Sequence, residues 1–403
     1  MATVRPVRRD RTIAFVALAA AVLGGLAALL LAAATGLTDG KTSTVYVPTT
    51  SLGAGNEPIV RSTPLSGKGF NPSRIYTARS PGVVTVFAFF AKADEGEAQG
   101  SGFVVTPSGY ILTSAHVVTD VVESTHPSEA HEVFIAFKGG DRVEAKIVGW
   151  DGYDDVALLK VDPAAHHLVT VPLGDSSRVR PGDPVAALGS PFGNEDSITV
   201  GVVSAVHRSI NSLTSTYKVV DAIQTDAPIT HGNSGGPLFD ARGRVIGINA
   251  QIRSESGGAE GVGFAVPINA AKRSMGQLIA TGKVVYAFLG VTTEDLTPTL
   301  ARHLGYSVSR GAMVGEVRSG SPADHAGVEG GNDDESFNGL DVTAGGDVIV
   351  AVNGVPVRSA DEVVRAVGSR LPGETIRLTV VRGDTRKVLS AKLGARPSSD
   401  TNP

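Results

Sequence analysis

Three short segments of the chain carry the residue types that serine-based hydrolysis requires. The segment Thr113–His116 ends in a histidine after an apolar run, and the carboxylates of Asp154-Asp155 stand directly before the apolar run Val156–Val161. The third segment, Gly232–Pro237, places Ser234 inside a glycine-rich turn. A serine hydroxyl is a poor nucleophile until a base such as histidine takes its proton, and a buried carboxylate can orient that base. The three segments together predict a Ser-His-Asp hydrolase.

The roles follow from this chemistry. We expect His116 to be the general base and Ser234 the nucleophile, while a carboxylate fixes the tautomer of the histidine. The glycines around Ser234 allow backbone N–H groups to converge on a developing oxyanion, and the predicted donor loop comprises Gly232, Asn233 and Ser234.

Two neighbouring carboxylates, Asp154 and Asp155, compete for the role of the catalytic acid. Successive residues of an extended chain point to opposite faces, so only one of the two can turn toward His116. Composition alone leaves the choice open, and we expect the other carboxylate to face solvent.

The turn Gly232–Gly236 also fits Gly-x-Ser-x-Gly, the nucleophile elbow of α/β-hydrolases. That fold requires a parallel sheet and the chain order Ser, acid, His. Here the order is His, Asp, Ser, and the surrounding pattern is one of short strands and hairpin turns. The chymotrypsin order on a β scaffold therefore fits better.

The elements that must position these residues are short apolar runs separated by turns. Such spacing is typical of sandwiches or barrels, and residues 75–267 are enough for two small β-barrels. Asn71-Pro72 predicts the start of a short helix that runs to about Arg79, and a second helix, Ala270–Thr281, should end at Gly282. The predicted strands are Val83–Phe90, Phe103–Val105, Tyr110–Thr113, Glu132–Phe137, Arg142–Trp150, Val156–Val161, Pro184–Leu188, Ile198–Val206, Tyr217–Thr225, Val245–Ile252 and Val262–Val266.

Composition narrows the function class. The 403 residues are 42% hydrophobic and 19% charged, which favours folded domains over disorder, and the net charge of −4 argues against a nucleic-acid binder. The chain has no cysteine, so disulfides and thiolate chemistry are excluded. His166-His167 and the acidic run Asn332–Glu335 lack the ligand spacing of a metal site. We expect neither a cofactor nor a metal.

The N-terminal region predicts a membrane segment. Residues 1–12 are basic, and Ile13–Ala34 form an uncharged run that is long enough to cross a bilayer as a helix. We expect a transmembrane helix over 13–37, with the rest of the chain outside the cytoplasm and a flexible linker over 38–70. A cleaved signal peptide and a buried soluble helix are the alternatives.

With these features in place, the chain resembles the HtrA/DegP family of serine proteases over residues 72–395. The resemblance rests on motifs in the family's order: Gly100–Phe103, Thr113–Val118, Asp155–Val161, Gly189–Gly193, Gln224–Ala227, Gly232–Leu238 and Gly261–Pro267. It implies a mainly β protein, with a chymotrypsin-like double β-barrel protease domain over 71–283 and an α+β PDZ domain over 286–395. A disordered tail would follow over 396–403.

The resemblance also implies roles for individual residues. It selects Asp155 as the acid, places Asn249, Ala250 and Gln251 along the substrate cleft, and favours cleavage after small aliphatic residues. Phe288, Leu289, Gly290 and Val291 resemble the loop that holds a peptide carboxylate through backbone N–H groups.

The same pattern has two departures. His231 stands where the family more often has Asn with Pro or Arg, and the loop Ala91–Ala98 is short, which argues against a large cage. The resemblance suggests a homotrimer. Residues 329–343 look like an insertion in the pattern of the PDZ domain. We expect them to form a solvated hairpin or loop.

The predicted function is a membrane-tethered, extracytoplasmic serine endopeptidase that cleaves unfolded or signalling proteins in envelope quality control or stress response. Its partners would be unfolded or C-terminally exposed proteins, peptide C-termini at the PDZ domain, and the membrane, with no nucleic acid. The alternative is a non-catalytic chaperone that binds clients through the PDZ domain.

Overall fold

The computed structural model describes residues 69–90, 96–120, 128–190, 197–211, 214, 218–230, 232–250 and 262–397. The predicted membrane segment 13–37, most of the linker 38–70, and residues His231 and Gln251 lie outside this described part, as do residues 398–403 of the predicted tail. No helix within the described ranges is long and apolar enough to cross a membrane.

The first half of the described chain closes into a six-stranded antiparallel barrel with the strand order β1-β2-β3-β6-β5-β4. Alternate residues of its strands point inward. Most of the residues between them are buried as well in β1 and β6, because several of them pack in a second apolar cluster. Val84, Val86, Ile111 and Leu159 are at most 1% exposed. The strands are β1 (Val83–Phe89), β2 (Glu97–Val104), β3 (Tyr110–Thr113), β4 (Glu132–Ala136), β5 (Arg142–Asp151) and β6 (Val156–Val161).

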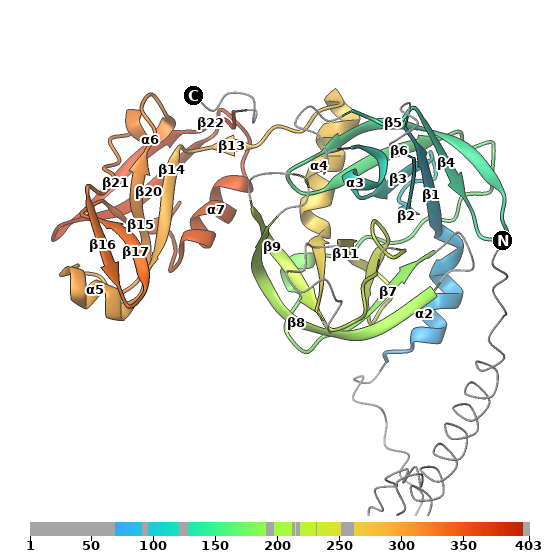
Figure 1. Ribbon diagram of the computed structural model, residues 1–403, viewed down its shortest axis with the longest axis horizontal. Helices are drawn as coiled ribbons and strands as arrows, with labels where there is room; N and C mark the ends of the chain where they lie inside the picture. Colours follow the sequence, from blue (N-terminus) through green and yellow to red (C-terminus); the bar gives the residue numbers. More distant parts are fainter. Residues whose placement is uncertain are drawn as a thin grey trace, which may run out of the picture. The chain divides into compact units, whose positions relative to one another are not determined.

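A second closed barrel follows, with the order β10-β11-β12-β9-β8-β7. Read in reverse, the order is β7-β8-β9-β12-β11-β10, which repeats the arrangement of the first barrel strand by strand. One continuous core cluster contains buried residues of both barrels, among them Leu112, Leu158, Leu188 and Phe239. The strands are β7 (Pro184–Gly189), β8 (Ser197–Asn211), β9 (Lys218–Thr225), β10 (Pro237–Asp240), β11 (Val245–Ala250) and β12 (Gly263–Pro267). The predicted double barrel is therefore observed (Figure 1).

Two helices frame the barrels. Helix α2 (Pro72–Arg79) begins as predicted, with the Asn71 side chain accepting the N–H of Arg74 at 3.0 Å. Helix α4 (Ile268–Thr281) ends at Gly282, whose φ of +71° is the left-handed conformation expected of a C-terminal glycine. A shorter helix, α3 (Ala115–Val118), was not predicted.

The C-terminal region forms a separate core around a mainly antiparallel sheet and helix α7 (Ala360–Gly368). The Ser359 hydroxyl caps the start of this helix by accepting the N–H of Glu362 at 3.3 Å. The sheet contains β14 (Val291–Leu296), β15 (Gly311–Val317), β18 (Val348–Val352), β19 (Val355–Pro356), β20 (Thr375–Arg382) and β21 (Thr385–Lys392). Beside it lie β13 (Ala287–Phe288), β22 (Gly394–Ala395), α5 (Pro298–Leu304) and α6 (Pro322–His325).

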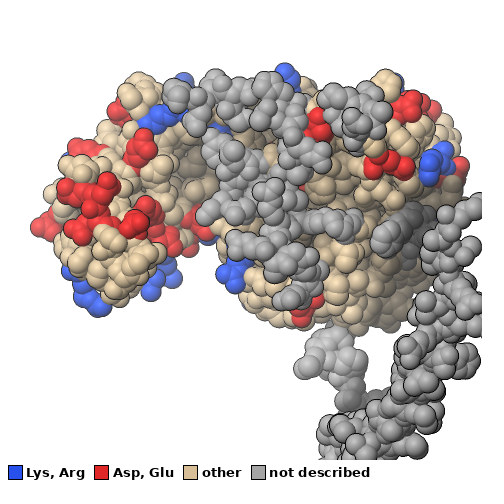
Figure 2. All heavy atoms as spheres, in the orientation of Figure 1, with Lys and Arg blue, Asp and Glu red and all other residues tan. Residues whose placement is uncertain are grey.

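The predicted insertion is a hairpin of β16 (Asp333–Phe337) and β17 (Leu340–Ala344). Its acidic residues Asp333, Asp334, Glu335 and Asp341 are exposed. Figure 2 shows acidic side chains gathered in the region of this hairpin. The hairpin is the solvated element that the sequence predicts.

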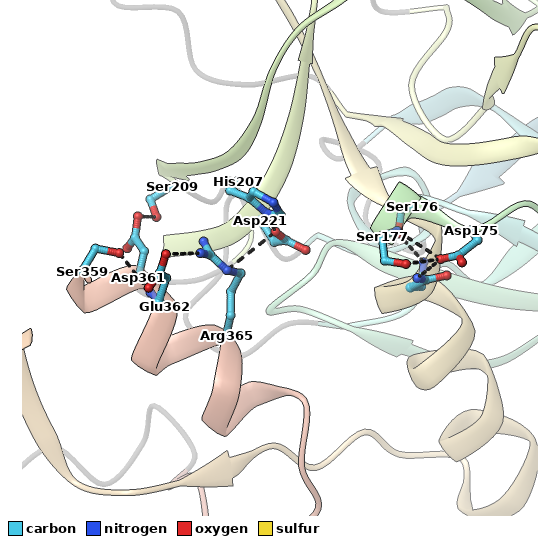
Figure 3. Close-up of polar contacts among 11 residues, drawn as sticks. Asp175, Ser176, Ser177, His207, Ser209, Asp221, Ser359, Asp361, Glu362 and Arg365 are labelled. Atoms are coloured by element: carbon cyan, nitrogen blue, oxygen red, sulfur yellow. Dashed lines mark hydrogen bonds and ion pairs between the residues drawn. The ribbon is translucent and has the colours of Figure 1, made fainter. Parts of the chain in front are cut away.

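Polar side chains connect α7 with the second barrel (Figure 3). The Ser209 hydroxyl of β8 donates to Asp361 Oδ2 at 2.6 Å, and Arg365 Nε lies 3.9 Å from Asp221 Oδ1 on β9. Asp221 also pairs with His207. The figure further shows Asp175, which caps the short 3-10 helix η2 (Ser176–Arg178) near the start of α4.

Candidate active site

The first barrel brings His116 and Asp155 together. Strand β3 ends at Thr113 and leads into α3, which carries His116, while Asp155 directly precedes β6. Because β3 pairs with β6, with Thr113 opposite Ala157, the two residues lie at the same end of the sheet. His116 Nδ1 is 2.7 Å from Asp155 Oδ2, and the backbone N–H of His116 donates to Oδ1 at 3.0 Å. One carboxylate therefore holds both the ring and the backbone of the histidine.

The electrostatics of this pair suit a general base. Burial acts to lower the pKa of His116, but the charge of Asp155 and its hydrogen bond outweigh burial and raise that pKa above the ordinary 6.5. Nδ1 bound to the carboxylate carries the proton of the neutral ring, which leaves Nε2 as a proton acceptor. Asp155 itself is 5% exposed and has a φ of +52°. Its backbone is thus in a conformation that non-glycine residues rarely adopt.

The second barrel supplies the turn that carries Ser234. Gly235 has a φ of +81°, and its N–H donates to the Asn249 carbonyl at 2.9 Å. The Ser234 carbonyl accepts the N–H of Ser101, from β2 of the first barrel, at 2.8 Å. The turn is therefore fastened to both barrels.

The hydroxyl of Ser234 is buried and has no hydrogen-bond partner among the described residues. The residue is 2% exposed. Catalytic hydrogen bonds in ligand-free sites are often long and tighten when substrate binds. A hydroxyl without a partner is compatible with the predicted role of Ser234 as the nucleophile.

The backbone around the turn corrects one member of the predicted oxyanion loop. The N–H of Asn233 donates to the Thr230 carbonyl at 2.9 Å, so it is used within the turn. We therefore remove Asn233 from the predicted donors. In the described part of the chain, no hydrogen bond uses the N–H of Gly232 or of Ser234. These two groups stay available as predicted donors.

The predicted cleft segment is only partly visible. The Asn249 side chain is 0% exposed, and its Nδ2 lies 3.3 to 3.4 Å from the carbonyls of Leu188, Asn233 and Pro237. Its backbone is used in the same way, since its N–H donates to the Gly236 carbonyl at 2.8 Å and its carbonyl accepts the N–H of Gly235. Asn249 therefore supports the Ser234 turn, and the prediction that it lines the substrate cleft is not borne out. Ala250 is 6% exposed, at the end of β11.

The prediction that Asp154 faces solvent is wrong. Burial, and then the charge of Asp151, raise the pKa of Asp154 to about 7. Asp154 is half-buried and lines a pocket with Tyr286, Arg273 and Arg396. Sequence reasoning missed Asp151 and Tyr286. The dipeptide Asp151-Gly152 was a turn signal for the first of them.

The predicted carboxylate-binding loop begins in β13 and ends at the first residue of β14. Gly290 has a φ of +85°, and its carbonyl accepts the N–H of Arg318 at 3.0 Å, while the Leu289 carbonyl accepts the N–H of Ala323 at 2.9 Å. A Cβ at Gly290 would lie 2.2 Å from the Cβ of Ser321, so only glycine fits. Among the described residues, no three His, Asp or Glu side chains gather to hold a metal ion.

Comparison with known proteins matches this architecture. The family model described as "Trypsin-like peptidase domain" matches residues 100–248, and the model "PDZ domain" matches residues 287–393. A protein named "Probable periplasmic serine endoprotease DegP-like" from Pseudomonas fulva is 39% identical over 306 residues, which are 76% of this chain and 58% of that protein. The corresponding protein of Rhizobium meliloti is 37% identical over 306 residues, covering 76% of this chain and 55% of the relative. The chain thus spans less than three-fifths of the length of these relatives.

A solved structure described as "HtrA-type protease AlgW with tripeptide" is 33% identical, with a TM-score of 0.66, and the match covers 82% of this chain and 99% of that one. The serine endoprotease from Yersinia pestis is 29% identical, with a TM-score of 0.55, over 81% of this chain and 98% of the other.

Proposed function

This chain belongs to the HtrA family of serine proteases, and from that premise we propose that it is a serine endopeptidase with Ser234 as nucleophile, His116 as general base and Asp155 as orienting acid. The observation that carries the proposal is the two-point contact of Asp155 with His116 on one barrel, together with a buried, unpaired serine hydroxyl on a glycine turn of the other. The predicted domains, 71–283 and 286–395, are part of this proposal.

The reaction would proceed through an acyl-enzyme. Nε2 of His116 takes the proton of Ser234 as Oγ attacks the scissile carbonyl carbon, and Asp155 stabilises the imidazolium that forms. The N–H groups of Gly232 and Ser234 would hold the oxyanion. The protonated histidine then gives its proton to the leaving amine, and water releases the acyl group by the same steps.

We propose unfolded proteins, or proteins with exposed C-termini, as substrates, cleaved after small aliphatic residues. Of the predicted cleft segment, Ala250 and Gln251 would line the cleft, and the loop Phe288–Val291 would hold a peptide carboxylate through its N–H groups. Solved structures of the relative AlgW are described with a tripeptide and with a decapeptide.

The cellular setting is proposed on the sequence and on the relatives. Relatives are named periplasmic endoproteases, which supports an extracytoplasmic site of action. The uncharged run Ile13–Ala34 behind a basic segment supports a single-pass anchor over 13–37. A homotrimer is the assembly proposed. Membrane fractionation tests the anchor, and release of the mature protein by a salt wash would contradict it.

The proposal is tested by casein hydrolysis with the full chain and its Ser234→Ala variant, with Ser204→Ala, an exposed serine of β8, as the matched control. The Ser234 variant should lose activity by several orders of magnitude, because the triad acts as a unit. A fluorophosphonate probe should label wild type and the control but not Ser234→Ala. Client binding without Ser234-dependent hydrolysis would instead support the alternative, a chaperone that works through its PDZ domain.

The choice of acid is tested separately. Asp155→Ala should lower the turnover rate by about 10³-fold or more, because the histidine then takes the wrong tautomer. Asp154→Ala should stay within a few-fold of wild type. The opposite result would reassign the acid.

A further inference from the structure

The backbone of Asp155, the proposed catalytic acid, has a conformation that neighbouring groups must hold in place. The residue has a φ of +52°, a left-handed conformation in which a side chain is strained unless neighbouring groups fix the turn. It is the last residue of a four-residue turn that connects β5 with β6, and Asp151 and Val156 form the pair that closes this turn. A group that fixes the turn therefore fixes the carboxylate that contacts His116.

The side chain of Asp151 is that group. Its Oδ1 accepts the N–H of Tyr153 at 3.0 Å and the N–H of Asp154 at 3.3 Å. A single oxygen therefore binds two backbone N–H groups in the middle of the turn. An aspartate that accepts from the backbone two and three residues further on stabilises a turn in this way. Asp151 is 2% exposed, so water does not compete for these bonds.

The second oxygen of Asp151 is held from outside the turn. Ser274 of α4, which is 1% exposed, donates its hydroxyl to Oδ2 at 2.6 Å. Tyr286, one residue before β13, donates its hydroxyl to the same atom. The backbone carbonyl of Tyr286 also accepts the N–H of Arg396 at 2.8 Å, beyond the last strand. One carboxylate thus connects the turn with α4 and with the segment that leads into the PDZ domain.

Four donors bind the Asp151 carboxylate, two from the turn and two from outside it. All four serve the turn that presents Asp155 or fasten that turn to a neighbouring element, and none belongs to a distant surface feature. Resting on the proposed protease function, we propose that Asp151 is a positioning residue for Asp155, and that Ser274 and Tyr286 hold Asp151 in place. The segment entering the PDZ domain would thereby contact the catalytic acid through a single intermediate side chain.

The primary test compares the full-chain variants Asp151→Ala and Asp151→Asn. The asparagine keeps one oxygen for the turn N–H groups, so it should rescue part of what alanine loses. The matched control is Asp240→Asn. Asp240 also accepts two backbone N–H groups with one oxygen, those of Arg242 and Arg244 at 2.9 Å each, but in the hairpin between β10 and β11.

Three readouts separate positioning from stability alone. The turnover rate of Asp151→Ala should fall by about 10²-fold with little change in KM, as for a reacting group displaced by about 1 Å. The acid limb of the pH profile of kcat/KM, which reports His116, should move to lower pH, because Asp155 raises the pKa of that histidine. The downfield proton resonance of His116 Nδ1–H should broaden or disappear, and this signal needs no turnover.

A loss of charge alone must be distinguished from a loss of position. Asp154→Asn removes a neighbouring carboxylate of the same turn but none of the four donors, so it should leave the resonance of His116 in place. The pair Ser274→Ala and Tyr286→Phe keeps the Asp151 carboxylate and removes both of its outer donors. It should reproduce a smaller part of the loss, about three- to tenfold in turnover.

The outcomes are decisive. Positioning is overturned if folded Asp151→Ala keeps the wild-type acid limb and the His116 resonance, or if Asp240→Asn loses them equally. Should Asp151→Ala not fold, the Ser274→Ala/Tyr286→Phe pair decides: unchanged turnover and resonance would overturn the proposal. Absence of Ser234-dependent hydrolysis in wild type would refute the protease function instead, while the resonance would still report on the Asp155–His116 contact.

Discussion

The turn behind Ser234 allows a sharp test of how tightly the two barrels fit. A Cβ built on Gly235 would lie 2.3 Å from the Ser101 carbonyl oxygen and 2.5 Å from Thr113 Oγ1, both in the first barrel. Gly182 has a similar φ, +90° against +81°, but a Cβ there would meet nothing within 4 Å. The substitutions Gly235→Ala and Gly182→Ala therefore share the backbone strain and differ in the steric clash.

The magnitude follows from the same contacts. Left-handed strain on an alanine should cost about 1–2 kcal/mol at either glycine. At Gly235 the Cβ also presses against the oxygen of Ser101, and forced shifts in a packed interior add about 1–3 kcal/mol. Loss of the hydrogen bond from Thr113 Oγ1 to the Ser101 carbonyl, 2.7 Å long, adds about 1 kcal/mol. We expect Gly235→Ala to destabilise the protein by roughly 2–4 kcal/mol more than Gly182→Ala.

The assay is urea unfolding followed by the fluorescence of Trp150, the one tryptophan of the chain, which lies in β5 of the first barrel. Casein hydrolysis of the folded variants accompanies it, and Gly235→Ala should also lose most turnover because Ser234 moves with the turn. Equal unfolding midpoints and equal turnover for the two alanine variants would refute the reasoning.

Two further predictions concern Asp154 and the PDZ loop. The folded-state pKa of Asp154, about 7, lies above its ordinary 3.8, so the folded state binds more protons between these values and stability falls as pH rises from about 4 to 7. Melting temperatures of Asp154→Asn across this range should lack that part of the fall, and an unchanged slope would contradict the burial argument. Gly290→Ala should weaken binding of a peptide with a free C-terminus by about tenfold or more, since its Cβ collides with Ser321. Gly305→Ala, with a φ of +73° and open space, should leave the affinity unchanged.

The sequence was most informative where chemistry or local rules act over a few residues. The glycine turn around Ser234 and the N-cap at Asn71 depend on neighbours within a few positions, and both take the predicted form. The strands of the two barrels follow from short apolar runs and turn signals in the same way, and several of these runs are buried almost continuously. Family motifs then supplied the order in which these local pieces combine.

The missed features depend on partners distant in the chain. Asp154 was placed in solvent because strand alternation was the only guide, whereas its surroundings include Tyr286, more than a hundred positions later. Helix α3 has only four residues, too few to show a helical period around His116. The N–H of Asn233 was assigned to the oxyanion although Thr230 uses it, because a glycine-rich sequence does not reveal which amides a turn consumes.

The order of the two barrels along the chain determines when hydrolytic activity could first appear during synthesis. The barrels share one strand arrangement, yet His116 and Asp155 belong to the first, and Ser234 lies in the second. During synthesis the ribosome therefore releases the proposed base and acid well before the proposed nucleophile. A nascent or truncated chain that ends before Ser234 would lack the proposed nucleophile, and a slightly longer one would still lack β10, β11 and β12 of the barrel that carries it. Hydrolysis would therefore begin only after the second barrel is complete.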